Sequence, residues 1–132
     1  MTIQINYKKS SSVRTSSSII LFADDKFNIK GIKKYFSNSE FIYVSDLLKN
    51  SDLDKDILLF DINSKKTIFL VSVKKDAKTS DIENLGAKFH SQINYDKKKD
   101  YFVNSDTIHS KVKNFLGYFL HGIKLKSYEF NI

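Results

Sequence analysis

Residues 56–73 have the sequence DILLFDINSKKTIFLVSV, the clearest structural pattern in the chain. Its two apolar runs, DILLFDI (Asp56–Ile62) and TIFLVSV (Thr67–Val73), are rich in residues typical of strands. Because the segment from Asn63 to Lys66 has the length of a hairpin loop, we predict that the two strands pair antiparallel. Both runs are apolar on both faces of the strand. This predicts a sheet that is covered by helices on both sides.

Three further segments have the pattern of strands: the alternating Ile3, Ile5 and Tyr7, the apolar run SIILFA (Ser18–Ala23), and DYFVN (Asp100–Asn104). Between the first two, Ser10–Ser18 is polar and of low complexity, which predicts a loop. Asp24, Asp25 and Lys26 end the second strand.

Two amphipathic helices are predicted in the second half of the chain. Ser80 followed by Glu83 has the spacing of a capping box, in which each side chain satisfies a backbone N–H at a helix start. The apolar stripe of this helix is Ile82, Leu85, Phe89 and Ile93; we expect the helix to run to about Asn94 and Lys97–Lys99 to close it. Asp106 or Thr107 can cap the last helix, whose stripe is Ile108, Val112, Phe115, Leu116, Phe119, Leu120 and Ile123.

The segment between residues 28 and 54 has a mixed pattern. Ile29, Ile32, Tyr35 and Phe36 follow helical spacing. Phe41–Val44 has the composition of a short strand, followed by a turn of helix at Ser45–Lys49. The chain therefore interleaves strands and helices, and the expected fold class is α/β: a three-layer mixed β-sheet flanked by helices, formed by one domain over residues 1–132.

Composition limits the class of protein. The 132 residues are 41% hydrophobic, enough for one domain to bury a core. Cysteine is absent, which excludes disulfides and thiolate metal sites and is typical of a reducing compartment. No signal peptide and no window of about 20 apolar residues is found. We therefore expect a cytoplasmic protein without a membrane partner.

The net charge of +7 is unevenly distributed. Residues 1–64 carry 9 basic and 8 acidic side chains, whereas residues 65–132 carry 13 basic and 7 acidic ones. A basic half of this kind is compatible with nucleic-acid binding. However, 21 of the 22 basic residues are lysine and only Arg14 is arginine, the residue that contacts phosphate or guanine through two parallel bonds. A solvated lysine surface is favoured, and nucleic-acid binding stays open as the alternative.

Candidate catalytic groups are few. His109 and His121 are twelve residues apart on one predicted helix, about 120° around its axis, so they cannot share a metal ion. With His90 they are interpreted as surface or boundary histidines. Asp24 and Asp25 follow a predicted buried strand, where α/β proteins often bind ligands, but a solvated turn is favoured because no partner base accompanies them. No glycine-rich phosphate loop, nucleophile elbow or zinc motif occurs. We assign no catalytic, cofactor-binding or metal-binding residue, and the chain alone is predicted not to be an enzyme.

Gly86 and Gly122, in two predicted helices, raise a packing question, because glycine costs about 1 kcal/mol relative to alanine there. Gly86 lies beside the apolar stripe of its helix, which predicts the close approach of a strand or a second helix. Gly117 lies on the opposite face of the last helix, and the sequence offers no packing reason for it.

The C-terminal segment Gly122–Phe130, GIKLKSYEF, resembles the G-x-x-L-x-S-Y-x-F signature that closes the N-terminal domain of leucyl (cytosol) aminopeptidases. Ile68–Val73 resembles the strand before a helix in that domain, and Glu83–Lys88, ENLGAK, resembles that helix with its small-residue step. The order of strands and helices resembles that of the family over nearly the whole chain. About twenty residues match the family's residues specifically.

The resemblance implies a macro-domain-like fold and a non-catalytic N-terminal domain, with a catalytic domain that lies outside these 132 residues. In the family, that domain holds two divalent metal ions on lysine and carboxylate ligands, includes an N-T-D-A-E-G-R motif, and hydrolyses N-terminal residues from peptides. The implied partners are this catalytic domain and further copies in a hexamer, and the implied role is in assembly, access or regulation.

The chain departs from the family where many members have G-L-G at the end of a strand and this sequence has Val71–Lys74. The missing glycines disfavour ADP-ribose-type binding, because a backbone without glycine approaches a ligand less closely. A macro-like small-ligand domain is accordingly an alternative function, beside the nucleic-acid-binding module.

Overall fold

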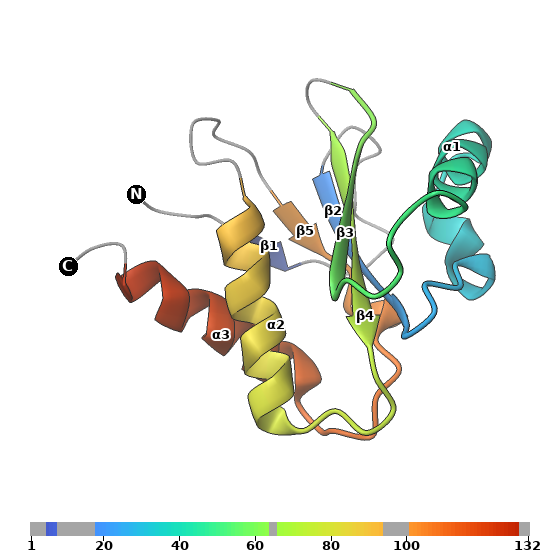
Figure 1. The fold of residues 1–132 in the computed structure, drawn as a ribbon. Coiled ribbons are helices and arrows are strands. Elements are labelled where there is room, and N and C mark those ends of the chain that lie inside the picture. The colour runs from blue at the N-terminus through green and yellow to red at the C-terminus, as the bar shows by residue number, and fades with distance from the viewer. Residues whose placement is uncertain (1–4, 8–17, 64–65, 94–100, 130–132) are drawn as a thin grey trace.

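The computed structural model describes residues 5–7, 18–63, 66–93 and 101–129. It forms a mixed five-stranded sheet between two layers of helices, which confirms the predicted α/β class (Figure 1). The strands are β1 (Ile5–Tyr7), β2 (Ser18–Asp24), β3 (Ile57–Asp61), β4 (Thr67–Val73) and β5 (Tyr101–Val103). The helices are α1 (Asn38–Leu48), α2 (Thr79–Gln92) and α3 (Phe115–Glu129), with short 3₁₀ helices η2 (Lys30–Tyr35) and η3 (Ser105–Thr107).

The strands lie in the order β1-β5-β2-β4-β3. The pairs β1–β5, β5–β2 and β2–β4 are parallel. The predicted hairpin is confirmed: β3 and β4 are antiparallel, with Leu59 opposite Phe69. β5, the last strand along the chain, is inserted between the first two, and each of its residues pairs with a residue of β2 that lies 83 positions earlier, as Tyr101 does with Ser18.

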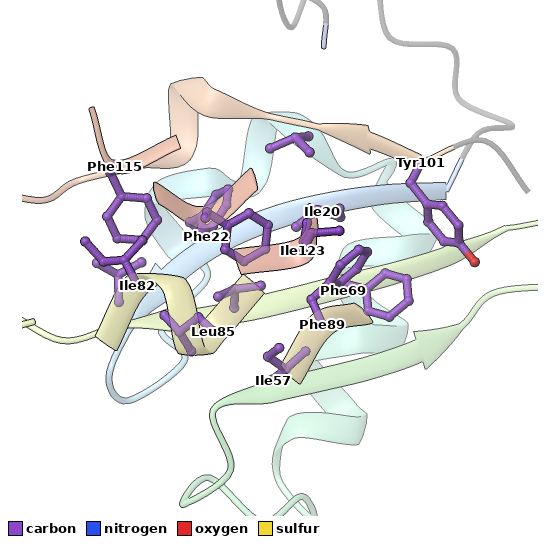
Figure 2. Packing of buried hydrophobic residues seen from close by; sticks show 14 of the residues in the cluster. Ile20, Phe22, Ile57, Phe69, Ile82, Leu85, Phe89, Tyr101, Phe115 and Ile123 are labelled. Atoms are coloured by element: carbon purple, nitrogen blue, oxygen red, sulfur yellow. The ribbon is translucent and has the colours of Figure 1, made fainter. Parts of the chain in front are cut away.

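One hydrophobic core fills the space between the sheet and the helices α2 and α3 (Figure 2). Its centre is aromatic: the Phe69 and Phe89 rings meet edge to face with centroids 4.9 Å apart, and the Phe22 ring contacts Phe115 and Phe119 in the same way at 5.5 and 5.3 Å. Such pairs contribute about 0.5–1.5 kcal/mol beyond area burial. The predicted stripe of α2, Ile82, Leu85, Phe89 and Ile93, is buried here as expected.

A second core lies on the other face of the sheet, under α1 and η2. Alternate residues of the two central strands point into it, including Leu21 of β2 and Leu70 of β4, and Val44 covers them from α1. Every residue of β4 is buried because strands and helices surround it on all sides. Two cores on opposite faces give the three-layer architecture.

The predicted cover on both faces of the sheet is confirmed, since Ile57 of β3 is buried in the first core and Leu58 and Phe60 in the second. β3 nevertheless lies at the edge of the sheet, and although Ile57 is 3% exposed, Leu59 on the same face is 40% exposed. The sequence pattern did not reveal this edge position, because periodicity cannot distinguish an edge strand from a central one.

The predicted strand at Phe41–Val44 was also wrong: these residues lie within α1, which continues through Ser45 to Leu48. The helix begins with a capping box, in which the Ser37 hydroxyl accepts a hydrogen bond from Glu40 N at 3.1 Å and the Glu40 carboxylate accepts one from Ser37 N at 3.0 Å. This start signal outweighs the strand propensity of the β-branched and aromatic residues that follow.

The predicted capping box at Ser80 and Glu83 was wrong, because α2 begins two residues earlier, with Lys78 as its N-cap. Its first residue is Thr79, and Asp81 accepts a hydrogen bond from Lys78 N at 2.8 Å. Glu83 is instead paired with His121 Nδ1 of α3. The lysines 97–99 expected to close the helix lie outside the described residues, as do Ile3 and residues 10–17 of the predicted loop.

The start of the last helix was predicted too early. Asp106 and Thr107 belong to η3, and α3 begins at Phe115. Of the predicted stripe, Phe115, Phe119 and Ile123 are buried in the first core. The other members, Ile108, Val112, Leu116 and Leu120, are partly buried against it.

Helices α2 and α3 cross in direct backbone contact, which confirms the packing reason predicted for Gly86. A Cβ atom on Gly86 would lie within 3.0 Å of Ile123 N and closer still to the Phe119 carbonyl oxygen. Reciprocally, a Cβ on Gly122 would lie 2.7 Å from the Glu83 carbonyl carbon. At the crossing, each helix thus has one glycine that lies against the backbone of the other helix. Gly117 has a local reason instead, because the Asn114 side chain occupies the space beside it.

Thr107 completes the hydrogen bonding of β2 beyond the end of β5. Its buried hydroxyl accepts a hydrogen bond from Phe22 N at 2.9 Å and donates one to Asn104 O at 2.8 Å. The side chain therefore replaces a strand neighbour for a backbone group that water cannot reach.

Thr107→Val is expected to destabilise the fold by about 2 kcal/mol, because valine keeps the shape and leaves Phe22 N unpaired in the core. Chemical denaturation measures the change. Thr79→Val at the exposed start of α2 serves as the control, with an expected change below about 0.5 kcal/mol. Equal effects of the two substitutions would contradict a special role for the Thr107 hydroxyl.

Candidate functional site

A groove of about 600 Å³ opens at the carboxyl end of β4, where the chain turns into α2. The loop Lys74–Lys78 and the first turns of α2 line one side of it, and Asp56 and Ser72 line the other. Ligands of open α/β sheets bind at this end of the strands. The groove is therefore the candidate site.

The charges in the groove balance. Lys74, Lys78 and Lys88 face it together with Asp56, Asp76 and Asp81. Two of the carboxylates have defined partners. Asp56 forms an ion pair with Lys88, and this pair joins the start of β3 to the middle of α2. Asp81 accepts the hydrogen bond from Lys78 N at the start of α2.

This arrangement restricts what the groove can bind. A helix N-terminus attracts anions through its free N–H groups, but here Asp81 places a negative charge in the first turn of α2, where its carboxylate accepts a hydrogen bond from Lys78 N. The strand end lacks glycine, so the backbone does not open a cradle for a phosphate. The groove suits a polar ligand or peptide segment with charges of both signs better than a pyrophosphate.

The aspartates singled out in the sequence, Asp24 and Asp25, are not among the residues that line this groove. Asp24 accepts hydrogen bonds from Lys26 N at 3.0 Å and from Asn28 N at 2.9 Å. Phe27, within this turn, has a positive φ of 55°. Asp24 and Asp25 are both exposed. Their carboxylates belong to a solvated turn, which was the favoured interpretation.

The three histidines do not converge. His109 is exposed, and the exposed His121 is paired with Glu83. His90 was expected at the surface or at the boundary of the core, but it is 1% exposed near the end of α2. Burial, and then the charge of Lys126, lowers the pKa of His90. Within the described residues, no three His, Asp or Glu side chains are grouped so as to hold a metal ion.

The lysine excess of the second half is partly used inside the fold. Lys66 is 5% exposed, and its Nζ lies 2.7 Å from Glu40 Oε2. Lys88 is paired with Asp56. These two lysines therefore do not contribute unpaired charge to a basic surface. Nucleic-acid binding stays a prediction.

Sequence reasoning did not find the groove, because its walls come from segments that are distant in the chain. Asp56 precedes β3, whereas Lys88 lies in the third turn of α2. The one available signal was the position of Lys74–Lys78, a charged loop between a buried strand and a helix.

Comparisons with known proteins return no match: no family model, no curated protein and no solved structure is similar to this chain. Across the described residues, no helix has the length and apolar character needed to cross a membrane.

Proposed function

We propose that residues 1–132 form the non-catalytic N-terminal domain of a leucyl aminopeptidase, a domain that acts in assembly, access or regulation. The observation that carries the proposal is the contact between the two segments on which the resemblance rests. Glu83–Lys88 lies on α2 and Gly122–Glu129 on α3, and the two helices meet at Gly86 and Gly122.

This contact gives the glycines of both segments a common physical reason. Gly122 opens the G-x-x-L-x-S-Y-x-F segment, and its lack of a side chain lets α3 pass over the Glu83 carbonyl. Gly86 is the small residue of the ENLGAK step, and it accommodates Phe119 in the same way. A mixed sheet between helices is also the architecture that the family resemblance implies. In such a parent protein, a two-metal site on the catalytic domain would activate the water that cleaves the peptide bond.

Two measurements test the proposal. The coding sequence downstream of Ile132 is expected to continue in frame and to encode the lysine, carboxylate and N-T-D-A-E-G-R pattern of the catalytic domain. The purified chain, assayed with Zn²⁺ or Mn²⁺ and a leucine anilide, is expected to show no hydrolysis. A stop codon after Ile132, or hydrolysis that chelation abolishes, would each contradict the assignment.

A further inference from the structure

Among the residues that the structure describes, the outer side of the edge strand β3 is a row of backbone groups with no neighbouring strand. β3 pairs with β4 on one side only, and no strand within the described residues pairs with its other side. In Figure 2 it lies at the outer border of the sheet, beyond the strand that carries Phe69. An edge of this kind is a template for another strand, because its N–H and C=O groups can extend the ladder.

The hydrogen bonds that flank β3 show which residues face outward. Ser72 N donates to Asp56 O at 2.8 Å, and Ile62 N donates to Lys66 O at 3.0 Å. The pairing of β3 with β4 is regular between these two hydrogen bonds. In an antiparallel pair, successive residues of a strand direct their N–H and C=O groups alternately toward the partner strand and away from it. Even-numbered residues of β3 therefore bond to β4. The backbone groups of Ile57, Leu59 and Asp61 point away from the sheet.

The outward backbone groups of these three residues can pair with the same groups of a second copy of the strand. Its three residues are spaced symmetrically about Leu59, so a two-fold axis through Leu59 brings Ile57 of one copy opposite Asp61 of the other. Each of the three resulting pairs can exchange both of its N–H···O bonds. Two-fold pairing of one patch with itself is also the commonest way in which soluble chains associate.

Most side chains of β3 do not oppose association. Natural edge strands are often protected by charged side chains, proline or a bulge, and β3 has no lysine, proline or bulge. Its one charged residue, Asp61, lies at the end of the strand, where its carboxylate accepts a hydrogen bond from the Thr67 hydroxyl at 2.8 Å. Leu59 is the centre of the strand and is 40% exposed, whereas Leu58 and Phe60 are buried in the second core. A partner strand would cover Leu59 with a second Leu59.

We propose that β3 is a self-association edge, at which two copies of this chain pair antiparallel about a two-fold axis through Leu59 and join their sheets into one. The occupant is a second copy because the outward groups match their own two-fold image. The pairing depends on β3 alone and not on the domain assignment above. Five-residue strands form a small interface, so the association is expected to be weak and concentration-dependent.

Hydrogen exchange and sedimentation on the intact chain test the pairing. Physiological salt is required, because the charge of +7 makes two copies repel at low ionic strength. The amides of Ile57, Leu59 and Asp61 are expected to exchange more slowly as the concentration rises, together with an increase in average mass. The amides of Leu58 and Phe60 are expected to stay protected throughout. A monomer up to about 1 mM, with unchanged exchange at Leu59, would overturn the proposal.

Matched substitutions locate the interface. Leu59→Lys places a charge at the centre of the pairing and is expected to lower the association constant at least about tenfold. Ile42→Lys, on α1 at 62% exposure, is the control and is expected to leave association unchanged. Thermal unfolding of both variants checks that they remain folded. Association that survives Leu59→Lys but is lost in Ile42→Lys would assign the contact to α1 and overturn the proposal.

A covalent trap provides an independent readout, because the chain contains no cysteine. In the proposed pairing the two Leu59 Cα atoms are about 5.5 Å apart, within the range that a disulfide spans. Under mild oxidation, Leu59→Cys is expected to form a linked dimer faster than Ile42→Cys, although Ile42 is the more exposed of the two. Faster linkage at position 42 would contradict the assignment of the edge.

Discussion

Replacing Gly86 with leucine is expected to destabilise the protein by about 3 kcal/mol or more, at the upper end of the cost of overpacking. The added Cβ alone would overlap the Phe119 carbonyl and lie 3.0 Å from Ile123 N. Both neighbours are backbone atoms of α3, so no side-chain rotation can relieve the overlap. The helix itself must move, and it carries Phe115 and Phe119 of the first core with it.

The measurement is thermal or chemical unfolding, and the expected fall in melting temperature is about 10 °C. Gly31→Leu is the matched control. Gly31 is exposed in η2, and a Cβ there would meet nothing within 4 Å, so its expected effect is below about 0.5 kcal/mol. An unchanged melting temperature for Gly86→Leu would show that α2 and α3 do not cross as closely as described.

Gly122→Leu is expected to have a similar effect, because a Cβ there would overlap the Glu83 carbonyl. The two substitutions act on one contact, so the double variant is expected to lose less stability than the sum of the two. Additive losses would indicate that each glycine is required for a separate reason.

The crossing of α2 and α3 was predictable from sequence only in part. A glycine beside the apolar stripe of α2 indicated that something approaches closely, since a helix otherwise gains from alanine. What approaches depends on how α3 lies against α2, and that orientation is fixed by the sheet beneath them. The insertion of β5 between β1 and β2 is equally non-local, because no feature of Tyr101–Val103 specifies which strands will flank it.

Local competition accounts for the other differences. Phe41–Val44 has the composition of a strand, yet the capping box of Ser37 and Glu40 starts a helix just before it. The same pattern at Ser80 and Glu83 does not form, because α2 begins with Lys78 as its N-cap and Asp81 as the carboxylate that accepts from Lys78 N, so Ser80 already lies inside the first turn. A capping pattern is therefore informative only where no neighbouring residues start the helix earlier. Likewise the groove needs Asp56 and α2 together, which no local pattern reveals.

Lys66→Met is expected to cost about 3 kcal/mol, because it leaves the carboxylate of Glu40 partly buried without its charged partner. The two side chains are 7% and 13% exposed, and their charged atoms are 2.7 Å apart. Lys49→Met is the control: its ion pair with Asp46 on the same helix is 3.6 Å long and largely exposed, so its expected effect is below about 0.5 kcal/mol. Equal losses in the two variants, measured by denaturation, would contradict a special role for the buried pair.

A double variant separates charge from packing. Glu40→Gln keeps an oxygen that can accept the hydrogen bond from Ser37 N, so it preserves the helix cap while it removes the negative charge. Combined with Lys66→Met it leaves no unpaired charge, and it is expected to recover most of the loss. If the double variant is as unstable as Lys66→Met alone, the lysine contributes through packing of its methylene chain and not through the ion pair.

The pH dependence gives a further distinction. Burial raises the pKa of Glu40, but the hydrogen bond and charge of Lys66 and the hydrogen bonds from Ser37 lower it more, so the folded value lies below 4.5. The unfolded chain then takes up the proton first, and this part of the stability is lost as the pH falls below about 4.5. His90 affects the stability in a higher range of pH. Because its folded pKa lies below 6.5, its contribution is lost from about pH 6.5 downward.

Lys66→Met is expected to reverse the first effect. Without the lysine, burial dominates and raises the pKa of Glu40, so protonation relieves the unpaired charge instead of breaking a pair. The difference in unfolding free energy between the original chain and Lys66→Met should therefore shrink between about pH 7 and pH 3.5, while the loss attributed to His90 stays the same in both. A difference that is constant over this range would show that the carboxylate of Glu40 does not depend on Lys66 for its ionisation.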